Sequence, residues 1–231
     1  MKKTLRLFRS LSIFERVLWL TSVIVVTVSF LCVPEKDYLT LIASLIGVTA
    51  LIFVAKGYVI GQILCIVFAV FYGIISFYFR YYGEMITYLG MSAPMAVAAT
   101  ISWIRHPYKE SKSVEIHKMK IWQVALMIAL AIGVTAGFYF ILRALGNENL
   151  VFSTISVTTS FLAVYMTFMR SPYYAIGYAL NDIVLIVLWV LASIENLSYI
   201  PMIICFIMFL INDIYGFINW KRMEHAQRKN N

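Results

Sequence analysis

Residues 172–194 read PYYAIGYALNDIVLIVLWVLASI, and after a short break residues 198–219 read SYIPMIICFIMFLINDIYGFIN. Each run is long enough to cross the roughly 30 Å hydrocarbon layer of a bilayer as a single α-helix. Each run also contains the dipeptide Asn-Asp, at 181–182 and at 212–213. An amide beside a carboxylate is costly in hydrocarbon, so such residues usually face a bundle interior or a wet cavity. The two runs therefore predict neighbouring membrane helices that carry polar residues at similar depth.

The rest of the chain has the same character. Of its 231 residues, 62% are hydrophobic and only 13% are charged, whereas soluble domains carry about 25% charged residues. The apolar runs show no alternation, which favours helices over a membrane β-barrel. We therefore predict an all-α integral membrane protein, a polytopic helical bundle. The expected spans are 14–33, 38–55, 59–79, 83–104, 120–145, 150–169, 172–194 and 198–219.

The distribution of basic residues orients these spans. If the N-terminus is inside, only Lys36, Arg80 and Arg143 of the 19 Lys and Arg residues fall in outer segments. The positive-inside rule then places both termini in the cytoplasm of a multi-pass protein of the cell membrane. The net charge of +8 reflects this bias and does not indicate a nucleic-acid partner. The first apolar run lacks a signal-peptidase pattern, so we expect it to be a retained helix.

A polar connection at 105–120 divides the chain into two similar halves. Three closely linked spans precede it, and a single span separates it from three more. Because three spans reverse the side of the chain, one linker helix is needed to make the two triplets parallel repeats, a plan typical of transporters. The expected parts are a tail with an accessory transmembrane helix (1–37), a first three-helix repeat (38–104), a cytoplasmic loop with the linker helix (105–149), a second three-helix repeat (150–220) and a cytoplasmic tail (221–231).

Polar residues of the second repeat lie on two helix faces that would form a site if they meet. Asn181 shares a face with Trp189, and Asn212 shares another with Tyr215. An amide both donates and accepts hydrogen bonds, and an aromatic face suits a flat heteroaromatic ring, above all a cationic one. These four residues are therefore predicted to bind a small-molecule substrate. The alternative is that the polar side chains only join helices.

Other candidates are weaker. Asp182, Asp213 and Asn219 are expected in supporting or inner-vestibule positions, and a proton relay through the aspartates stays open. Further substrate-binding candidates in the first repeat are Gln62, Tyr72 and Tyr88, and Pro94 permits a kink in the fourth span. The cysteines and histidines are scattered, so neither a metal site nor a cofactor is expected. Interface anchoring is expected of the tryptophans at span ends, Trp19, Trp103, Trp122 and Trp220.

Several stretches resemble the PnuC-type vitamin transporters. The resemblance covers about residues 38–222, and its most specific part is NDIYGFINW at 212–220. It also includes FYGIIS (71–76), YGEM (82–85), Pro94-Met95, Trp103, NDI (181–183) and Leu188-Trp189. The resemblance implies a fold like that of the SWEET sugar transporters, with three, one and three helices. The N-terminal helix would then lie outside the core.

The resemblance also implies a function, the facilitated uptake of nicotinamide riboside followed by trapping through phosphorylation by a separate cytosolic kinase. Homo-oligomers, trimers among them, are expected. The chain departs from the family at Tyr174 and Gly177, where tryptophans are frequent, and near Tyr88, where Asn or Gln is frequent. Related carriers take thiamine, riboflavin or deoxynucleosides, so these substrates remain alternatives.

Two other classes of function are disfavoured. An integral-membrane enzyme acting on lipid phosphates needs clustered acidic residues for a metal, and the only aspartates in the spans, Asp182 and Asp213, have no DxxxD-like spacing. A purely structural subunit does not account for the parallel repeat, since repeats about an axis imply a central path. We therefore predict a transporter and not an enzyme.

Overall fold

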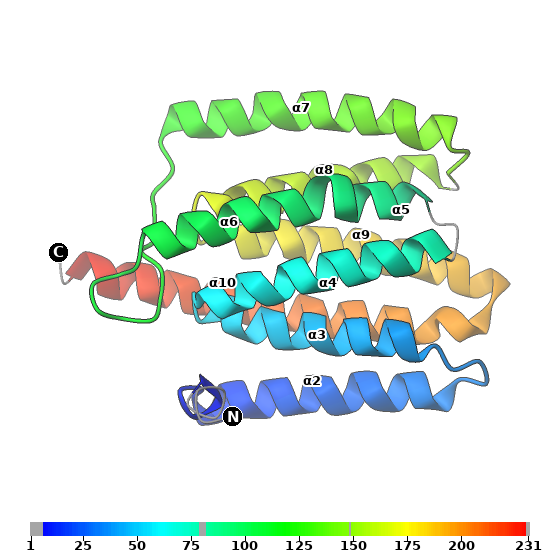
Figure 1. Ribbon diagram of the computed structural model, residues 1–231, viewed down its shortest axis with the longest axis horizontal. Helices are drawn as coiled ribbons and strands as arrows, with labels where there is room; N and C mark the ends of the chain where they lie inside the picture. The colour runs from blue at the N-terminus through cyan, green and yellow to red at the C-terminus, as the bar shows by residue number, and fades with distance from the viewer. Residues whose placement is uncertain (1–6, 79–81, 148, 230–231) are drawn as a thin grey trace.

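The computed structural model describes residues 7–78, 82–147 and 149–229, so Lys2, Lys3, Arg6 and Arg80 of the charge map lie outside it. In these ranges, 8 helices are long and apolar enough to cross a membrane, and they lie side by side (Figure 1). Their boundaries agree with the predicted spans to within a few residues, except at the C-terminal end. The predicted all-helical membrane fold is thereby confirmed.

The elements alternate in direction along the chain. They are α2 (Ile13–Cys32), α3 (Tyr38–Ala55), α4 (Val59–Tyr78), α5 (Tyr82–Ile86), the π-helical segment η1 (Thr87–Ser92), α6 (Ala93–Arg105), α7 (Ile121–Ala144), α8 (Leu150–Phe168), α9 (Tyr174–Glu195), the 3₁₀ turn η2 (Leu197–Tyr199) and α10 (Ile200–Lys229). We call the end of the bundle that carries the connection 105–120 the loop end, and the opposite end the cavity end.

The fourth span is irregular because of a proline. It runs through α5, η1 and α6, and Pro94 stands in the first turn of α6. Proline has no N–H with which to continue an α-helical ladder. The N–H of Ala93 instead bonds to the carbonyl of Tyr88, five residues back, as in a π-helical turn. The kink expected at Pro94 thus takes the form of a π-helical segment.

Six helices form a closed ring. In order around it, α3, α4, α6, α8, α9 and α10 each pack on their two neighbours, and α10 closes the ring against α3. Helix α2 lies outside the ring against α3 and α10, and α7 lies outside it against α8 (Figure 1). The interior of the ring is therefore shared by helices from both halves of the chain.

The turns that follow α3 and α8 have the same geometry. In the first turn, Gly57 has φ 68° and its N–H bonds to the carbonyl of Val54 at 2.8 Å. In the second turn, Arg170 has φ 56° and its N–H bonds to the carbonyl of Thr167 at 3.0 Å. A positive φ is easy for glycine and strained for arginine. By position in the turn, Arg170 therefore corresponds to Gly57. The basic residue of the first turn, Lys56, stands one position earlier.

The interface-anchor prediction was wrong for Trp103 and Trp220. Both side chains are fully buried, with ring centroids 5.3 Å apart at the loop end. The Trp103 indole donates to the carbonyl of Thr167, and the Trp220 indole donates to the carbonyl of Val54, each at 2.9 Å. These carbonyls lie in the last turns of helices, where intrahelical partners are missing. The two tryptophans join helices of one half to helices of the other.

Helix α10 continues well past residue 220, where the C-terminal tail was expected to begin. Glu224 forms ion pairs within the helix with Lys221 at 2.8 Å and Arg228 at 2.6 Å. Gln227 extends the contact to the connection 105–120, because its side chain donates to the carbonyl of Val114 at 3.0 Å and accepts from the N–H of Ile116 at 2.8 Å. The end of α10 is thus part of the packed loop end.

Candidate functional site

The larger of two adjoining cavities lies between the two halves of the chain. It has a volume of about 510 Å³, and its wall comes from α5 and η1 on one side and from α8 and α9 on the other, with the turn between α7 and α8 closing the rim. Pockets of this size bind drug-sized ligands. Polar groups in the lining come mostly from hydroxyl and amide side chains, namely Thr87, Tyr88, Asn147, Asn149, Ser153, Ser156, Ser160 and Tyr199.

A second cavity of about 360 Å³ adjoins the first at the cavity end. It lies between the C-terminal end of α2, the first turn of α3, α4 and the η2 turn. Three residues line both cavities, Glu84, Trp189 and Tyr199. The rings of Trp189 and Tyr199 touch, with centroids 5.5 Å apart. The two cavities therefore share one wall, and a large part of that wall is aromatic.

A second pair of aromatic rings stands beside this wall. Tyr72, which lines the smaller cavity, and Tyr88, which lines the larger one, have ring centroids 4.6 Å apart. The Tyr72 hydroxyl lies beside the carboxyl group of Glu84. Tyr72, Tyr88 and Trp189 were all predicted from the sequence, and the structure brings the three together at the cavities.

Glu84 was missed as a site residue. Its Oε2 atom is buried and has no hydrogen-bond partner among the described residues. An acidic residue in a membrane span is rare and usually functional, so its place inside the fourth span was a usable signal. The residue lies near the start of that span, where a carboxylate is common enough to be overlooked.

Asn181 lies behind the larger cavity. Its side-chain oxygen accepts hydrogen bonds from Ser156 at 3.1 Å and from Thr159 at 3.0 Å, both on α8. Ser156 itself lines the cavity. The amide of Asn181 thus holds a hydroxyl group of the lining, so the residue is one step removed from the cavity space.

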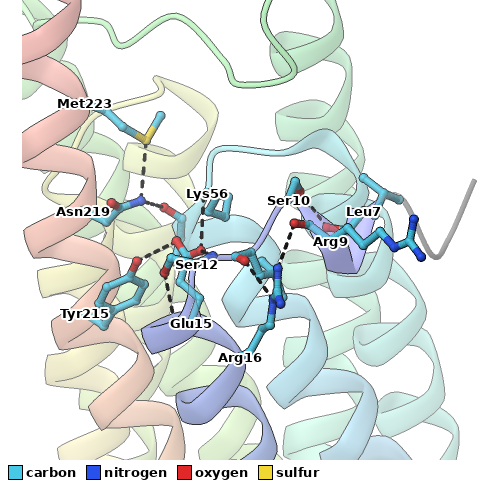
Figure 2. Close-up of polar contacts among 12 residues, drawn as sticks. Leu7, Arg9, Ser10, Ser12, Glu15, Arg16, Lys56, Tyr215, Asn219 and Met223 are labelled. Carbon is cyan, nitrogen blue, oxygen red and sulfur yellow. Dashed lines mark hydrogen bonds and ion pairs between the residues drawn. The ribbon is translucent and has the colours of Figure 1, made fainter.

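Asn212 and Tyr215 do not meet Asn181 and Trp189. Asn212 is 1% exposed, and its amide donates to Ser22 of α2 at 3.0 Å and to the carbonyl of Met208 at 2.7 Å. Tyr215 donates to Glu15 of α2 at 2.7 Å (Figure 2). The expected convergence of the two helix faces is therefore not found, because this face of α10 packs against the N-terminal helix.

Asn219 continues the same face toward the loop end. Its amide donates to the carbonyl of Ala55 in the last turn of α3 at 2.8 Å, and it also reaches the sulfur of Met223 at 3.8 Å (Figure 2). Gln62 of α4 is 3% exposed and lines neither of the two cavities. Neither residue faces the space where a ligand fits.

The aspartates meet each other. Asp182 of α9 and Asp213 of α10 are both buried, and their carboxyl groups are hydrogen-bonded to one another. Such a bond requires that one of the two carries a proton, because an ionised carboxylate can only accept. Neither residue lines the two cavities. They join two helices of the second half in a position that fits the predicted supporting role.

The positions where the family often has tryptophan are closed in this protein. Tyr174 is 1% exposed and packs on Trp220 with ring centroids 4.8 Å apart. Gly177 lies so close to α8 that an added Cβ would stand 2.9 Å from the Cα of Ala163. A larger side chain at Gly177 would separate α8 from α9. Aromatic contacts to a ligand must therefore come from other residues here.

Residues 37–222 match the family described as nicotinamide mononucleotide transporter. The chain belongs to this family. The nicotinamide riboside transporter PnuC of Neisseria mucosa is 26% identical over 222 residues, which cover 94% of this chain and 84% of that protein. The crystal structure of the vitamin B3 transporter PnuC matches with a TM-score of 0.82 at 24% identity, over 96% of both chains, and at this identity the match concerns the fold.

These similarities confirm the family that the sequence motifs indicated. The protein is a membrane transporter of the PnuC family and not an enzyme, as predicted. The matched region includes α3 to α9, α10 as far as residue 222 and the whole lining of the larger cavity, and it leaves α2 outside.

Proposed function

We propose that the protein carries nicotinamide riboside, or a closely related nucleoside-like vitamin, into the cell by facilitated diffusion. The observation that carries this proposal is the larger cavity. It is large enough for a nucleoside, offers hydroxyl and amide groups for a ribose, and presents aromatic rings for a flat base. The substrate contacts in this cavity come from Trp189 and Tyr88, with Tyr72 packed against Tyr88 and Asn181 acting through Ser156.

The charge of the cavity favours a riboside over a mononucleotide, whose names both occur among the relatives. The two compounds differ by one phosphate group. Phosphate sites use arginine, lysine or backbone N–H groups. Among the described residues that line the larger cavity there is no Lys, Arg or His, and the charged ones are Glu84 and Glu195. A phosphate would therefore meet repulsion in this space.

The helix arrangement supports alternating access between two parallel three-helix repeats, α3 to α6 and α8 to α10, with α7 as the linker and α2 as the accessory helix. The matching turns after α3 and α8 support the repeat. Both cavities lie at the cavity end, while Trp103, Tyr174 and Trp220 are packed together at the loop end. With the loop end in the cytoplasm, this is a state closed toward the cytoplasm. Gln62, on the loop-end half of α4, is a candidate for the inner part of the path.

Transport is proposed to be passive, with a cytosolic kinase trapping the product, and the protein to work as a homo-oligomer, trimers included. The proton-relay alternative depends on the aspartate pair, and neither aspartate lines the two cavities. We expect the Asp182→Asn variant to transport normally, because an amide can still donate to Asp213.

Calorimetric titration of the purified protein tests the substrate. We expect binding of nicotinamide riboside and at least about tenfold weaker binding of the mononucleotide, which corresponds to about 1.4 kcal/mol. Equal or tighter binding of the mononucleotide would contradict the assignment. Uptake into liposomes tests the mechanism: equilibration without accumulation, unchanged by a protonophore, is expected, and accumulation driven by a pH gradient would contradict facilitated diffusion.

A further inference from the structure

Glu84 lies on the wall that the two cavities share. Its carboxyl oxygen Oε2 is buried and has no hydrogen-bond partner among the described residues. The Tyr72 hydroxyl lies beside the carboxyl group. Among the described residues, the acidic partners in ion pairs are Glu15 and Glu224, so Glu84 makes no ion pair there. A buried carboxylate without a counter-charge is costly. The cost falls when a ligand of opposite charge occupies the cavity.

The surroundings of this carboxyl group are those of a cation site. Two pairs of touching rings line the adjoining cavities: Tyr88 lines the larger cavity and its neighbour Tyr72 the smaller one, while Trp189 and Tyr199 line both. The faces of such rings attract a positive charge within about 6 Å, and more strongly when water is excluded. Glu195 adds a second negative charge at the edge of the larger cavity. The only described cation lining either cavity is Lys36, and it belongs to the smaller one.

We propose that Glu84 makes the protein selective for ligands whose heteroaromatic ring carries a positive charge. The ring lies against the aromatic wall, and the carboxylate supplies the counter-charge with its unpaired oxygen. This inference rests on the proposed function of the larger cavity as the substrate site, and it names the class of substrate. Glu84 is thus a specificity-determining residue that the sequence did not single out.

The proposal separates the candidate substrates by charge. The pyridinium ring of nicotinamide riboside and the thiazolium ring of thiamine are cations, whereas riboflavin and the deoxynucleosides are uncharged. The reduced form of nicotinamide riboside, a dihydropyridine, has nearly the same shape but no charge. This pair of ligands isolates the effect of charge from the effect of shape.

The test is a calorimetric titration of wild-type protein, Glu84→Gln, Glu84→Asp and the surface control Glu110→Gln with both forms of nicotinamide riboside. Glu84→Gln should weaken binding of the cation on the order of 10- to 100-fold, because it removes a buried counter-charge to the ring. Binding of the dihydropyridine should change by less than about threefold. Glu84→Asp keeps the charge and should retain part of the preference, and Glu110→Gln should match wild type. Thermal unfolding without ligand shows whether each variant is folded.

The outcomes distinguish this inference from the proposed substrate. If the wild-type protein binds nicotinamide riboside and Glu84→Gln binds it equally well, or loses both forms alike, the inference is overturned and the proposed function stands. If the wild-type protein binds thiamine instead, and Glu84→Gln loses it, the inference stands and the proposed substrate falls. Binding of riboflavin or deoxynucleosides alone overturns both.

Discussion

Trp103 and Trp220 lie against each other, and each donates an equivalent hydrogen bond to the half of the chain to which the other belongs. Trp103 ends the first half of the chain and donates to Thr167 in the second, while Trp220 ends the second half and donates to Val54 in the first, both at 2.9 Å. Their rings are 5.3 Å apart. Each tryptophan thus reaches the last turn of the first helix of the other half. This exchange holds the loop end closed.

We expect Trp103→Phe and Trp220→Phe to lower stability by similar amounts. Each change keeps an aromatic ring and removes one buried hydrogen bond, which contributes about 1 kcal/mol. For a chain of this size, that corresponds to about 2–4 °C in the unfolding temperature. The measurement is thermal unfolding in detergent, monitored through the reaction of a thiol label with Cys205, which is buried in the folded protein. Trp122→Phe is the control, since Trp122 is 58% exposed, and a shift of equal size there would remove the explanation.

Glu15 joins α2 to both halves of the ring, and its neutralising partner is Lys56. Lys56 Nζ lies 3.2 Å from Glu15 Oε2, and Tyr215 donates to the other oxygen at 2.7 Å (Figure 2). Lys56→Met leaves a buried carboxylate without its charge partner and should destabilise the protein by about 2 kcal/mol or more. The double variant Glu15→Gln/Lys56→Met should recover part of this loss, because the buried charge is then absent.

A matched control for this pair is Lys221→Met, which breaks a more exposed ion pair with Glu224. Such pairs contribute about 0–1 kcal/mol. Equal effects of Lys56→Met and Lys221→Met on the unfolding temperature would show that Glu15 is not held by charge. If the losses caused by Glu15→Gln and by Lys56→Met simply add in the double variant Glu15→Gln/Lys56→Met, the same conclusion follows.

Gly177 sets the spacing of α8 and α9. A Cβ there would lie 2.9 Å from the Cα of Ala163, a backbone atom that cannot rotate away. Gly177→Ala should therefore destabilise the protein by about 1–3 kcal/mol, the usual effect of overpacking. Gly133→Ala on α7 has open space around it and should be neutral or stabilising by up to about 1 kcal/mol. Unfolding of both variants in detergent gives the comparison, and equal stability would contradict close packing at Gly177.

The sequence was sufficient for the spans and the family because both depend on local composition and on short motifs. Length and hydropathy alone place a helix such as α7, since nothing else is needed for a span. A sequence pattern does not show which residues each helix face packs against. Asn212 and Tyr215 share a helix face, as predicted, but periodicity cannot tell that this face meets Ser22 and Glu15 of α2.

The same limit explains the tryptophans and Glu84. An indole at the end of a span is typical of an interface anchor, and only the ring of helices shows that Trp103 and Trp220 are enclosed by the other half of the chain. Conversely, Glu84 near the start of a span looks like a boundary residue. In the structure α5 packs on α4, and Glu84 lines both cavities, a placement that depends on tertiary contacts.

Asn181 and Asn212 each belong to an Asn-Asp dipeptide, but their substitutions should affect ligand binding differently. Asn181→Leu removes the acceptor for Ser156, a hydroxyl group of the cavity lining. That hydroxyl can then turn away from the ligand, and we expect about tenfold weaker binding of nicotinamide riboside, equivalent to one hydrogen bond. Asn212→Leu breaks the contact with Ser22 of α2 and should lower stability while leaving the dissociation constant within about threefold of wild type.

Calorimetry and thermal unfolding on the same purified samples separate the two effects. Asn212→Leu tests whether α2 acts only from outside the ring. Among the described residues, the Oδ1 atom of Asn212 has no hydrogen-bond partner, and its amide nitrogen donates to Ser22 and Met208. If this variant unfolds at the wild-type temperature and yet fails to bind, Asn212 contacts the ligand in a state other than the one described. If Asn181→Leu binds normally, Ser156 is positioned without it, and the polar side of the site must come from the other hydroxyl groups of α8.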